Sequence, residues 1–361
     1  MITLRSGRPQ KIGNHMKEYL EKVKPYIEEG FVSVQYHPED ENLAIFNYSN
    51  KCQWEQKWDE ITMMSRGLII NIKTGERLSN PLPKFFNYEE AINKGLEIPR
   101  EAPVVTKKYD GWLGISYWLN GSPRISTRGS FASPGALWAT DWLGKNIPKE
   151  AIPKDKTLLF EIIHPITKIV CNYDFEGLVH FATREIETGK EDRSFSVHER
   201  FKRAEEIPFN DITALKAMEE KNQEGFVIFY PEVNSRLKIK FDEYKRLHKI
   251  MTGVSEIGVW EFLRDNRSLD PLLEKVPDEF YQWVNRVVDD LKRKYMEIEK
   301  ESGYVLGNLH PGMPRKEQAE VIKKGKYPGV SFSMLDGKDY SQVIYKMIRP
   351  HGQSSFKNDE L

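Results

Sequence analysis

Hydrophobic and polar residues alternate over many short stretches in the first part of the chain, and glycine, proline or asparagine bounds most of these stretches. Alternation with a period of two is typical of β-strands that bury one face. The pattern predicts strands at residues 31–36, 43–48, 65–70, 104–108, 113–119, 124–127, 157–163, 168–173, 178–183, 224–230 and 237–240. Helical spacing predicts helices at residues 15–29, 134–143, 197–203 and 212–219. The predicted fold class is therefore α+β, built on antiparallel sheets.

The pattern changes after about residue 242, where the chain becomes helical in character. One stripe of apolar residues follows the helical period, which predicts a long helix that packs its apolar side into a core. The stripe consists of Phe280, Val284, Val287, Val288, Leu291, Tyr295 and Ile298. We therefore expect two domains, an α+β domain at residues 1–250 and a smaller all-α domain at residues 251–361.

Composition narrows the class of protein. A chain of 361 residues with 39% hydrophobic residues can bury real cores, which excludes a disordered protein. The 54 basic and 54 acidic residues balance, so any nucleic-acid site must be a local basic face rather than a basic whole. Two cysteines are too few for a disulfide framework or a cysteine-built zinc site. The sequence shows neither a signal peptide nor an apolar run long enough to span a bilayer. We therefore expect a soluble, cytoplasmic protein that engages no membrane.

The first candidate for chemistry is the pattern Lys-x-Asp-Gly formed by Lys108, Asp110 and Gly111 at the end of a predicted strand. Lysine is a poor nucleophile at neutral pH because its ordinary pKa is about 10.4, but a buried or charge-crowded lysine can attack phosphorus. Asp110 lies on the same strand face as Lys108, and Gly111 lets a substrate approach the backbone. Alone, the pattern is short and is equally typical of a solvated strand end followed by a turn.

Charged residues also interrupt strands that are otherwise apolar. Glu161 divides an apolar run, Glu224 precedes an aromatic and β-branched run, and Lys238 and Lys240 share one face of the last strand. Each of these could be a solvated residue on an exposed sheet face. Together with Lys108 they form a set of three cations and two acids that suits a nucleoside triphosphate, because cations bind phosphates and acids bind ribose hydroxyls or a metal ion.

Four segments resemble, in this order, motifs I, III, IV and V of the covalent nucleotidyltransferases, the superfamily of polynucleotide ligases and messenger-RNA capping enzymes. The four segments are 108–111, 160–161, 224–225 and 237–240. Further segments resemble the bacteriophage RNA ligase 1 family in particular. These segments are 65–67, 84–87, 127–130 and 165–170, together with Tyr173, Tyr244 and the Leu247-His248 pair. The resemblance extends over about residues 43–250, and the eight segments occur in the same order as in the family.

The resemblance implies an ATP-dependent RNA ligase that works in three steps. Lys108 attacks the α-phosphate of ATP and becomes lysyl-AMP, the AMP passes to the 5′-phosphate of an RNA end, and a 3′-hydroxyl then displaces the AMP and seals the strand. The partners implied are RNA with 5′-phosphate and 3′-hydroxyl ends, with nicked tRNA as the family's expected substrate, and a separate polynucleotide kinase and phosphatase that prepares the ends. The C-terminal helical domain is then expected to recognise the RNA end or tRNA.

The resemblance also assigns roles to residues. The implied catalytic residues are Lys108, Asp110, Glu161, Glu224, Lys238 and Lys240. The implied ATP-binding residues are Tyr48, Arg66, Lys84, Lys108, Gly111, Arg128, Glu161, Glu224, Lys238 and Lys240. Lys238 and Lys240 are further expected to lower the pKa of Lys108 by like-charge crowding. Arg128 and Tyr244 are assigned to RNA and the ligation step, and a Mg²⁺ or Mn²⁺ ion to Glu224, directly or through water, and to Asp270. A helix N-cap before Pro271 is an equally good explanation of Asp270.

Two departures and two alternatives accompany this interpretation. Arg128 stands where the phage pattern has a lysine, and Trp112 follows Asp110-Gly111 where a small residue is usual and is expected to narrow the pocket mouth. A DNA ligase or a capping enzyme would share these motifs, but it would carry an OB-fold after the last motif, where this chain is helical in character. An RNA-end-binding module without catalysis is the non-enzyme alternative, which the complete set of motif residues disfavours.

Overall fold

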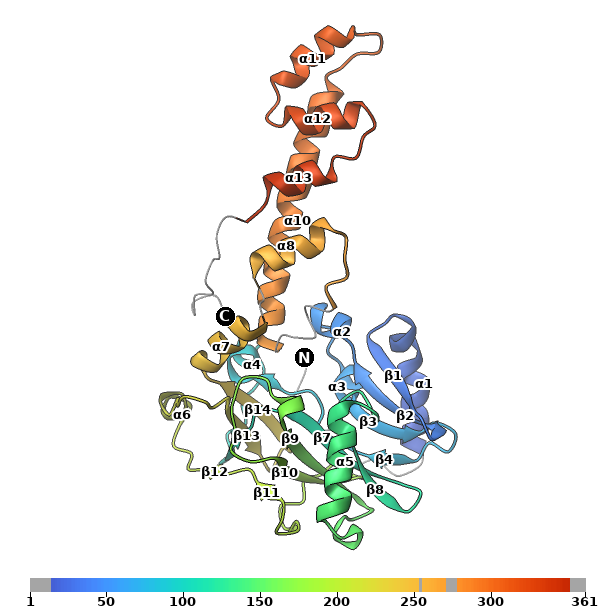
Figure 1. The fold of residues 1–361 in the computed structure, drawn as a ribbon, viewed down its shortest axis with the longest axis vertical. Coiled ribbons are helices and arrows are strands. Elements are labelled where there is room, and N and C mark those ends of the chain that lie inside the picture. Colours follow the sequence, from blue (N-terminus) through green and yellow to red (C-terminus); the bar gives the residue numbers. More distant parts are fainter. Residues whose placement is uncertain (1–13, 253–254, 271–277, 351–361) are drawn as a thin grey trace. The chain divides into compact units, whose positions relative to one another are not determined.

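The computed structural model describes residues 14–252, 255–270 and 278–350 (Figure 1). The chain divides into two compact units, Met1–His248 and Lys249–Leu361. The first unit contains three β-sheets and the second is helical. Most neighbouring strands are antiparallel, which confirms the predicted α+β fold class.

The N-terminal sheet has four strands in the order β1-β2-β3-β4. Their bounds are Val32–His37, Asp40–Tyr48, Arg66–Asn71 and Arg77–Ser79. Helix α1 (Asn14–Glu28) packs on this sheet, as Figure 1 shows in blue, and α2 (Asn50–Trp54) and α3 (Glu60–Met64) follow β2. Their shared core contains Tyr19, Val23, Phe46, Leu68 and Ile70, among other buried residues. The sheet thus forms a separate layer beside the two larger sheets.

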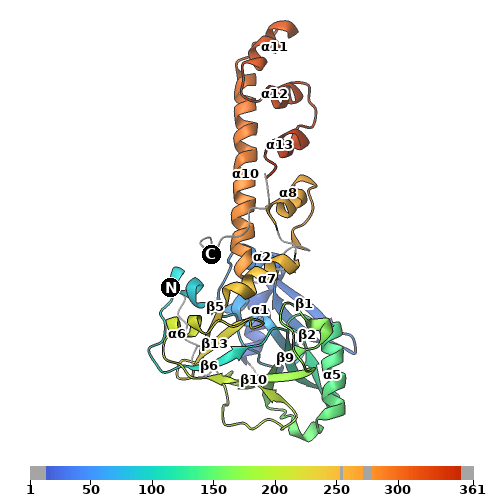
Figure 2. The same cartoon turned by 60° about the vertical axis from the view of Figure 1, so that its left-hand side comes forward.

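The second sheet has the order β11-β10-β9-β7-β8. Its strands are β7 (Trp112–Leu119), β8 (Ser122–Ser126), β9 (Lys156–Ile163), β10 (Gly177–Glu185) and β11 (Lys202–Arg203). Helix α5 (Pro134–Asn146) covers one face of it (Figure 2). Two short 3₁₀ turns, η1 (Lys149–Ala151) and η2 (Pro165–Thr167), flank β9.

The third sheet has the order β12-β6-β13-β14-β5. Its strands are β5 (Phe86–Asn87), β6 (Val104–Lys108), β12 (Glu206–Ile207), β13 (Gly225–Tyr230) and β14 (Ser235–Lys240). Helices α4 (Tyr88–Asn93) and α6 (Ile212–Ala217) lie in the connections. One face of this sheet packs into a core that includes Phe226, Ile228, Leu237 and Ile239. The charged residues of β14 occupy the opposite face, because side chains alternate along a strand.

A turn at residues 186–191, after β10, ties the three sheets together. Arg77 of β4 and Asn80 donate hydrogen bonds to the carbonyl oxygen of Ile186, at 3.0 and 2.9 Å. Arg184 of β10 and Asn234, which precedes β14, donate to the carbonyl oxygen of Gly189. Burial lowers the pKa of Arg184 to about 9. Side chains from all three sheets therefore converge on two backbone oxygens.

The second unit consists of helices around one long helix. These are α8 (Glu256–Arg264), α10 (Asp278–Gly307), α11 (Arg315–Lys323), α12 (Pro328–Leu335) and α13 (Ser341–Met347), and α7 (Asp242–Thr252) spans the division between the units. Val284, Val288, Leu291 and Ile298 on α10 are buried, as predicted for a stripe that packs into a core. In the part of the chain that the structure describes, no helix has the length and apolar character that crossing a membrane requires.

Two sequence predictions of local structure are wrong. Residues 168–173 form no strand, because the backbone amides of Val170 and Cys171 donate to the side chain of Asp110 instead of to a neighbouring strand. Residues 197–203 form no helix, and their last two residues pair in parallel with β10 as β11. In both cases contacts with distant parts of the chain override the local pattern.

Candidate active site

Lys108 is the last residue of β6, and the register of the third sheet places it beside Lys240. Gly225 at the start of β13 pairs with Lys108 on one side and with Lys240 on the other. A side chain at Gly225 is excluded, because a Cβ atom there would lie 2.0 Å from the carbonyl oxygen of Ile239. The two lysines therefore flank the point at which Glu224 enters the sheet.

Glu224 forms ion pairs with both lysines. Lys108 Nζ lies 2.8 Å from Glu224 Oε2, and Lys240 Nζ lies 3.0 Å from Glu224 Oε1. Glu224 is only 2% exposed, so its charge depends on these partners. Burial acts to raise the pKa of Glu224, but the two ammonium groups outweigh it and hold that pKa below its ordinary value. The carboxylate is thus ionised and shared between two cations.

The pKa of Lys108 is raised, contrary to the expectation from like-charge crowding. Burial and the charge of Lys240 act to lower this pKa, but Glu224 and Glu161 outweigh both. The nucleophile of the proposed reaction is therefore held as an ammonium ion in this state of the protein. Whatever weakens the pairing between Lys108 and Glu224 also frees the lysine to lose its proton.

Glu161 on β9 is the second acid at this site, and it is half-buried. Its Oε1 accepts a hydrogen bond of 3.0 Å from the backbone N–H of Gly111. Burial raises the pKa of Glu161 to about 7, although the charge of Lys108 acts to lower it. A Cβ atom at Gly111 would lie 2.4 Å from the carbonyl oxygen of Ile162, so glycine is required where β9 passes so close. Trp112, by contrast, packs against Gly135 of α5 on the other face of the sheet from Glu161, so it does not narrow the mouth of the site.

Asp110 is engaged by the protein on both carboxylate oxygens. Its Oδ2 accepts from the backbone amides of Val170 and Cys171, both at 2.7 Å, and its Oδ1 accepts from the hydroxyl of Tyr244 at 2.8 Å. The backbone N–H of Asp110 donates to the hydroxyl of Tyr173. Asp110 is 2% exposed, and Tyr244 is 3% exposed. These contacts give Asp110 and Tyr244 a positioning role for the segment that carries Lys108.

A second group of predicted site residues consists of basic side chains that lie close to aromatic rings. Arg128 donates to the hydroxyl of Tyr48 at 2.9 Å, and its guanidinium lies 5.0 Å from the centre of that ring. Lys84 Nζ lies 4.9 Å from the ring of Trp58 and 5.6 Å from that of Phe86. A planar guanidinium stacks better on a ring than an ammonium does, which gives a structural reason for arginine at position 128.

Phe85 joins this group to β14. The guanidinium of Arg66 lies 5.3 Å from the ring of Phe85, and Lys238 Nζ lies 6.0 Å from the same ring. Lys238 also pairs in register with Asn87 of β5, directly after the Lys-Phe-Phe segment. Because Lys238 and Lys240 share one face of β14, the strand connects the aromatic group with the Lys108 ion pairs.

The donor set fits a nucleotide better than a protein-built metal cage. Within residues 14–252, 255–270 and 278–350, no group of three or more His, Cys, Asp or Glu side chains is placed to hold a metal ion. Both oxygens of Glu224 contact lysines, and Asp270, in the second unit, accepts a hydrogen bond from Ser268. Pro271, with which a helix start at Asp270 was predicted, lies outside the described residues. Magnesium bound chiefly through nucleotide phosphates needs only one or two carboxylates from the protein.

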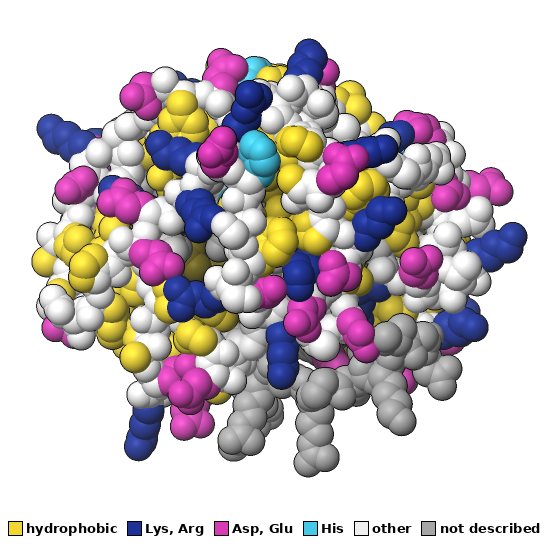
Figure 3. Space-filling view, turned by 90° about the horizontal axis from the view of Figure 1, so that it is seen from below, with side chains coloured by type: hydrophobic (Ala, Val, Ile, Leu, Met, Phe, Trp, Pro, Cys, Tyr) yellow, Lys and Arg dark blue, Asp and Glu magenta, His cyan; other side chains and the backbone are white. Residues whose placement is uncertain are grey.

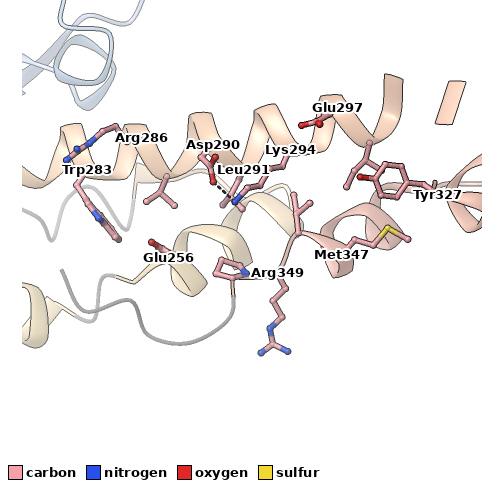
Figure 4. Close-up of a pocket in the computed structure, with 14 residues that line it drawn as sticks. Glu256, Trp283, Arg286, Asp290, Leu291, Lys294, Glu297, Tyr327, Met347 and Arg349 are labelled. Atoms are coloured by element: carbon pink, nitrogen blue, oxygen red, sulfur yellow. Dashed lines mark ion pairs between the residues drawn. The ribbon is translucent and has the colours of Figure 1, made fainter. Parts of the chain in front are cut away.

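The second unit contains a pocket that no pattern in the sequence predicts. Its cavity volume is about 650 Å³, and it is lined by residues of α8 and α10 and by residues at the ends of α12 and α13 (Figure 4). The charged residues among them are Glu256, Asp290, Glu297, Arg286, Lys294 and Arg349. Asp290 and Lys294 form an ion pair at 2.6 Å. The lining is thus balanced in charge, unlike the lysine-rich face of β14.

Comparison with known proteins finds relatives by sequence, whereas no family model matches the chain. A protein of Thermovibrio ammonificans named putative RNA ligase is 24% identical over 249 residues, which cover 64% of this chain and 64% of the relative. A protein of Autographa californica nuclear polyhedrosis virus named putative bifunctional polynucleotide kinase/RNA ligase is 28% identical over 241 residues, 58% of this chain and 34% of the relative. RNA ligase 1 of bacteriophage TS2126 is 30% identical over 142 residues, 34% of this chain and 35% of the relative.

The three relatives are all named RNA ligases. The resemblance predicted from the motifs is therefore confirmed. The alignments span 64% or less of the length of each relative. Among solved structures, an archaeal ATP-dependent RNA ligase is similar with a TM-score of 0.49 and 14% identity, covering 91% of this chain and 84% of that one. A putative ATP-dependent DNA ligase from Aquifex aeolicus has a TM-score of 0.45 and 15% identity, covering 88% and 99%.

Proposed function

We propose that this protein is an ATP-dependent RNA ligase that joins 3′-hydroxyl and 5′-phosphate ends through lysyl-AMP and RNA-adenylate intermediates. The observation that carries the proposal is the pair of ion pairs that Lys108 and Lys240 form with the buried Glu224, with Glu161 beside them. Sequence similarity to proteins named RNA ligase supports the choice of RNA. In this proposal residues 1–250 carry out adenylyl transfer.

The first step needs a neutral Lys108. After losing its proton, Lys108 Nζ attacks the α-phosphorus of ATP, a P–N bond forms, and the bond from the α-phosphorus to the bridging oxygen breaks to release pyrophosphate. Lys238 and Lys240 are placed on one strand face to neutralise the phosphates, which is the main task in such transfers. A bound Mg²⁺ or Mn²⁺ ion would supply further charge neutralisation, with Glu224 as its protein ligand, directly or through water.

In this proposal the ionisation of the site keeps Lys108 unreactive while it is paired with Glu224. Glu224 holds Lys108 protonated, so attack requires that Glu224 be drawn from Lys108. Glu161, with a pKa of about 7, can accept a hydrogen bond from a ribose hydroxyl when ionised. Glu224 is buried and the Lys108 side chain is 19% exposed, which limits the water around the reacting atoms and strengthens their interactions.

The later steps involve RNA. An RNA 5′-phosphate oxygen attacks the phosphorus of lysyl-AMP and breaks the P–N bond, and a 3′-hydroxyl oxygen then displaces AMP. Arg128, stacked on Tyr48, is the proposed contact for the triphosphate or RNA phosphates, with Arg66 and Lys84 beside the same aromatic group. Tyr244 acts in this proposal through Asp110 rather than on the RNA. Residues 251–361 would recognise the RNA end or a nicked tRNA, and a separate kinase and phosphatase would prepare the ends.

Transfer of label from ATP carrying a radiolabelled α-phosphate tests the proposal. The wild type should become labelled in the presence of Mg²⁺, and Lys108→Ala should not, because it lacks the nucleophile. Lys107→Ala is the matched control, since Lys107 is the neighbouring residue on the strand and pairs with Glu205 instead. It should become labelled as the wild type does.

Other outcomes of the same experiment separate the alternatives. Labelling from GTP in place of ATP would indicate capping chemistry, and sealing of nicked DNA in preference to RNA by the labelled enzyme would indicate a DNA ligase. If folded wild-type protein cleared of bound AMP takes no label from any nucleotide, the ligase mechanism is refuted. RNA binding that survives in that case would favour an end-binding module.

A further inference from the structure

The strongest feature that the proposed mechanism leaves unused is a bridge between Asn172 and Asn222, which are 50 positions apart. The backbone N–H of Asn172 donates to Asn222 Oδ1 at 2.7 Å, and Asn222 Nδ2 donates to the carbonyl oxygen of Asn172 at 2.7 Å. The side-chain amide of Asn222 thus pairs with one residue's backbone much as a neighbouring strand would. Asn222 has a φ of +63°, in the left-handed region that asparagine tolerates better than most residues.

Both ends of the bridge lead directly to the active site. Asn172 follows Val170 and Cys171, whose amides hold Asp110, two residues after Lys108. Asn222 precedes by two residues Glu224, which pairs with Lys108. These hydrogen bonds, the ion pair between Glu224 and Lys108 and the short chain segments between them therefore form a closed loop of contacts, called the ring below. The ring includes Lys108, the proposed nucleophile.

Within this ring the bridge is the exposed link. Asn172 and Asn222 are both exposed, whereas Asp110 and Glu224 are buried. On its other side Glu224 is held by its carbonyl oxygen, which accepts from the backbone N–H of Phe241 at 2.9 Å. The residues directly before Glu224 belong to no helix or strand. The bridge connects their backbone to the segment 170–172, whose amides bind Asp110.

We propose that Asn222 is a positioning residue of the adenylyl-transfer step, which holds the Glu224 carboxylate in register with Lys108 through its bridge to the backbone of Asn172. This inference rests on the proposed function. Small displacements of a reacting group cost about 10²-fold in rate per Å. Loosening one exposed link of the ring should have part of that effect, and we expect a loss of about 10-fold.

The bridge should affect a rate rather than the amount of active protein. A displaced Glu224 slows the attack by Lys108 in every folded molecule, so the single-turnover rate constant of lysyl-AMP formation should fall. A residue that only stabilised the fold would instead reduce the fraction of protein that becomes labelled and leave the rate constant of that fraction unchanged.

Asn222→Gly is the decisive variant, because glycine keeps the left-handed backbone and removes only the amide. Asn120→Gly is the matched control: Asn120 also has a positive φ, +51°, and lies in the exposed turn between β7 and β8. Asn172→Ala is a second control, since Asn172 contributes only backbone groups to the bridge. Single-turnover formation of lysyl-AMP from labelled ATP is measured for each variant, and the KM for ATP, the maximal rate constant and the fraction of protein labelled are determined separately.

We expect Asn222→Gly to lose about 10-fold in maximal rate constant, with little change in KM or in the fraction of protein that becomes labelled. Both controls should match the wild type. The two exposed hydrogen bonds contribute only a small part of ordinary domain stability, so a temperature exists at which circular dichroism shows every variant folded. Rates are compared there.

An Asn222→Gly variant with the rate constant of Asn120→Gly overturns the inference. A smaller labelled fraction at an unchanged rate constant also overturns it, because the bridge would then only stabilise the fold. If the wild type itself forms no lysyl-AMP, the proposed function fails and this inference with it. If the wild type forms lysyl-AMP, the comparison of variants judges the bridge alone.

Discussion

The two ends of β14 carry buried ion pairs of different character. Arg236 and Lys240 share one face of the strand, and each pairs with a buried glutamate. Arg236 pairs with Glu191 in the turn after β10, and its guanidinium lies 4.1 Å from the ring of Phe229. Around this pair the neighbouring Arg184 donates to backbone carbonyls. Nothing in this arrangement changes its charge near neutral pH, because arginine stays protonated.

At the other end one glutamate serves two lysines. Glu224 pairs with Lys108 and Lys240, and Glu161 beside them has a pKa of about 7. Lysine can release its proton when its partner is withdrawn, and a carboxyl with this pKa can change charge near neutral pH. In the proposed function, one strand would thus anchor the fold at its arginine end and support chemistry at its lysine end.

The largest expected effect is on stability at the arginine end. Glu191→Ala leaves Arg236 buried without its acid, which should cost about 3–5 kcal/mol of unfolding free energy. Denaturant unfolding measures it, with Glu187→Ala, an exposed residue of the same turn, as the control. Equal losses in the two variants would remove the contrast between the two ends.

At the lysine end the expected effect is on rate. Glu224→Gln should slow formation of lysyl-AMP by about 10²-fold, because Lys108 loses the partner that fixes its position. It should lose less stability than Glu191→Ala, since Lys108 can become neutral whereas Arg236 cannot. Label transfer from ATP and denaturant unfolding are measured together, with the exposed Glu220→Gln as the control. A variant that keeps its rate but unfolds easily would show that Glu224 is structural.

The smallest expected effect concerns pH. The folded protein holds the proton of Glu161 up to about pH 7, whereas the unfolded chain releases it near the ordinary pKa of 4.5. Stability should therefore fall as pH rises through this interval, and Glu161→Gln should weaken that fall by roughly 1–3 kcal/mol, because glutamine has no proton to lose. Urea unfolding of both proteins at a series of pH values measures it. Parallel curves for wild type and variant would contradict the raised pKa.

The longer strands of the first unit could be predicted from the sequence because their alternation is local, whereas the two- and three-residue strands β4, β5, β11 and β12 were not predicted. Alternation placed Lys238 and Lys240 on one face, and the structure has both on β14 in that arrangement. The long apolar stripe predicted α10 in the same way. The resemblance to RNA ligases then named the residues around Lys108, whose roles remain predictions.

What the sequence could not show are contacts made by loops. The bridge from Asn222 to Asn172, and the amides of Val170 and Cys171 on Asp110, join irregular segments that have no period to detect. The sign of the pKa change at Lys108 was missed for a related reason. It depends on how closely Glu224 and Glu161 approach, and one-dimensional spacing contains no such distance.

The surface gives a further contrast with the interior of the first unit. On the face seen in Figure 3, basic and acidic side chains are interspersed, with apolar side chains between them. A mixed surface of this kind matches the zero net charge of the sequence. Within the first unit, one face of β14 carries the three cations Arg236, Lys238 and Lys240, and the first two are buried.

The turn at residues 186–191 has a consequence for the order in which the chain folds. The hydrogen bonds from Arg77 and Asn80 to Ile186 join residues 109 and 106 positions apart. Closing such long loops costs entropy before any contact repays it, so these bonds form only after the separate sheets exist. The turn is therefore a late assembly point, and refolding should gain β-structure before it gains the environment of this turn.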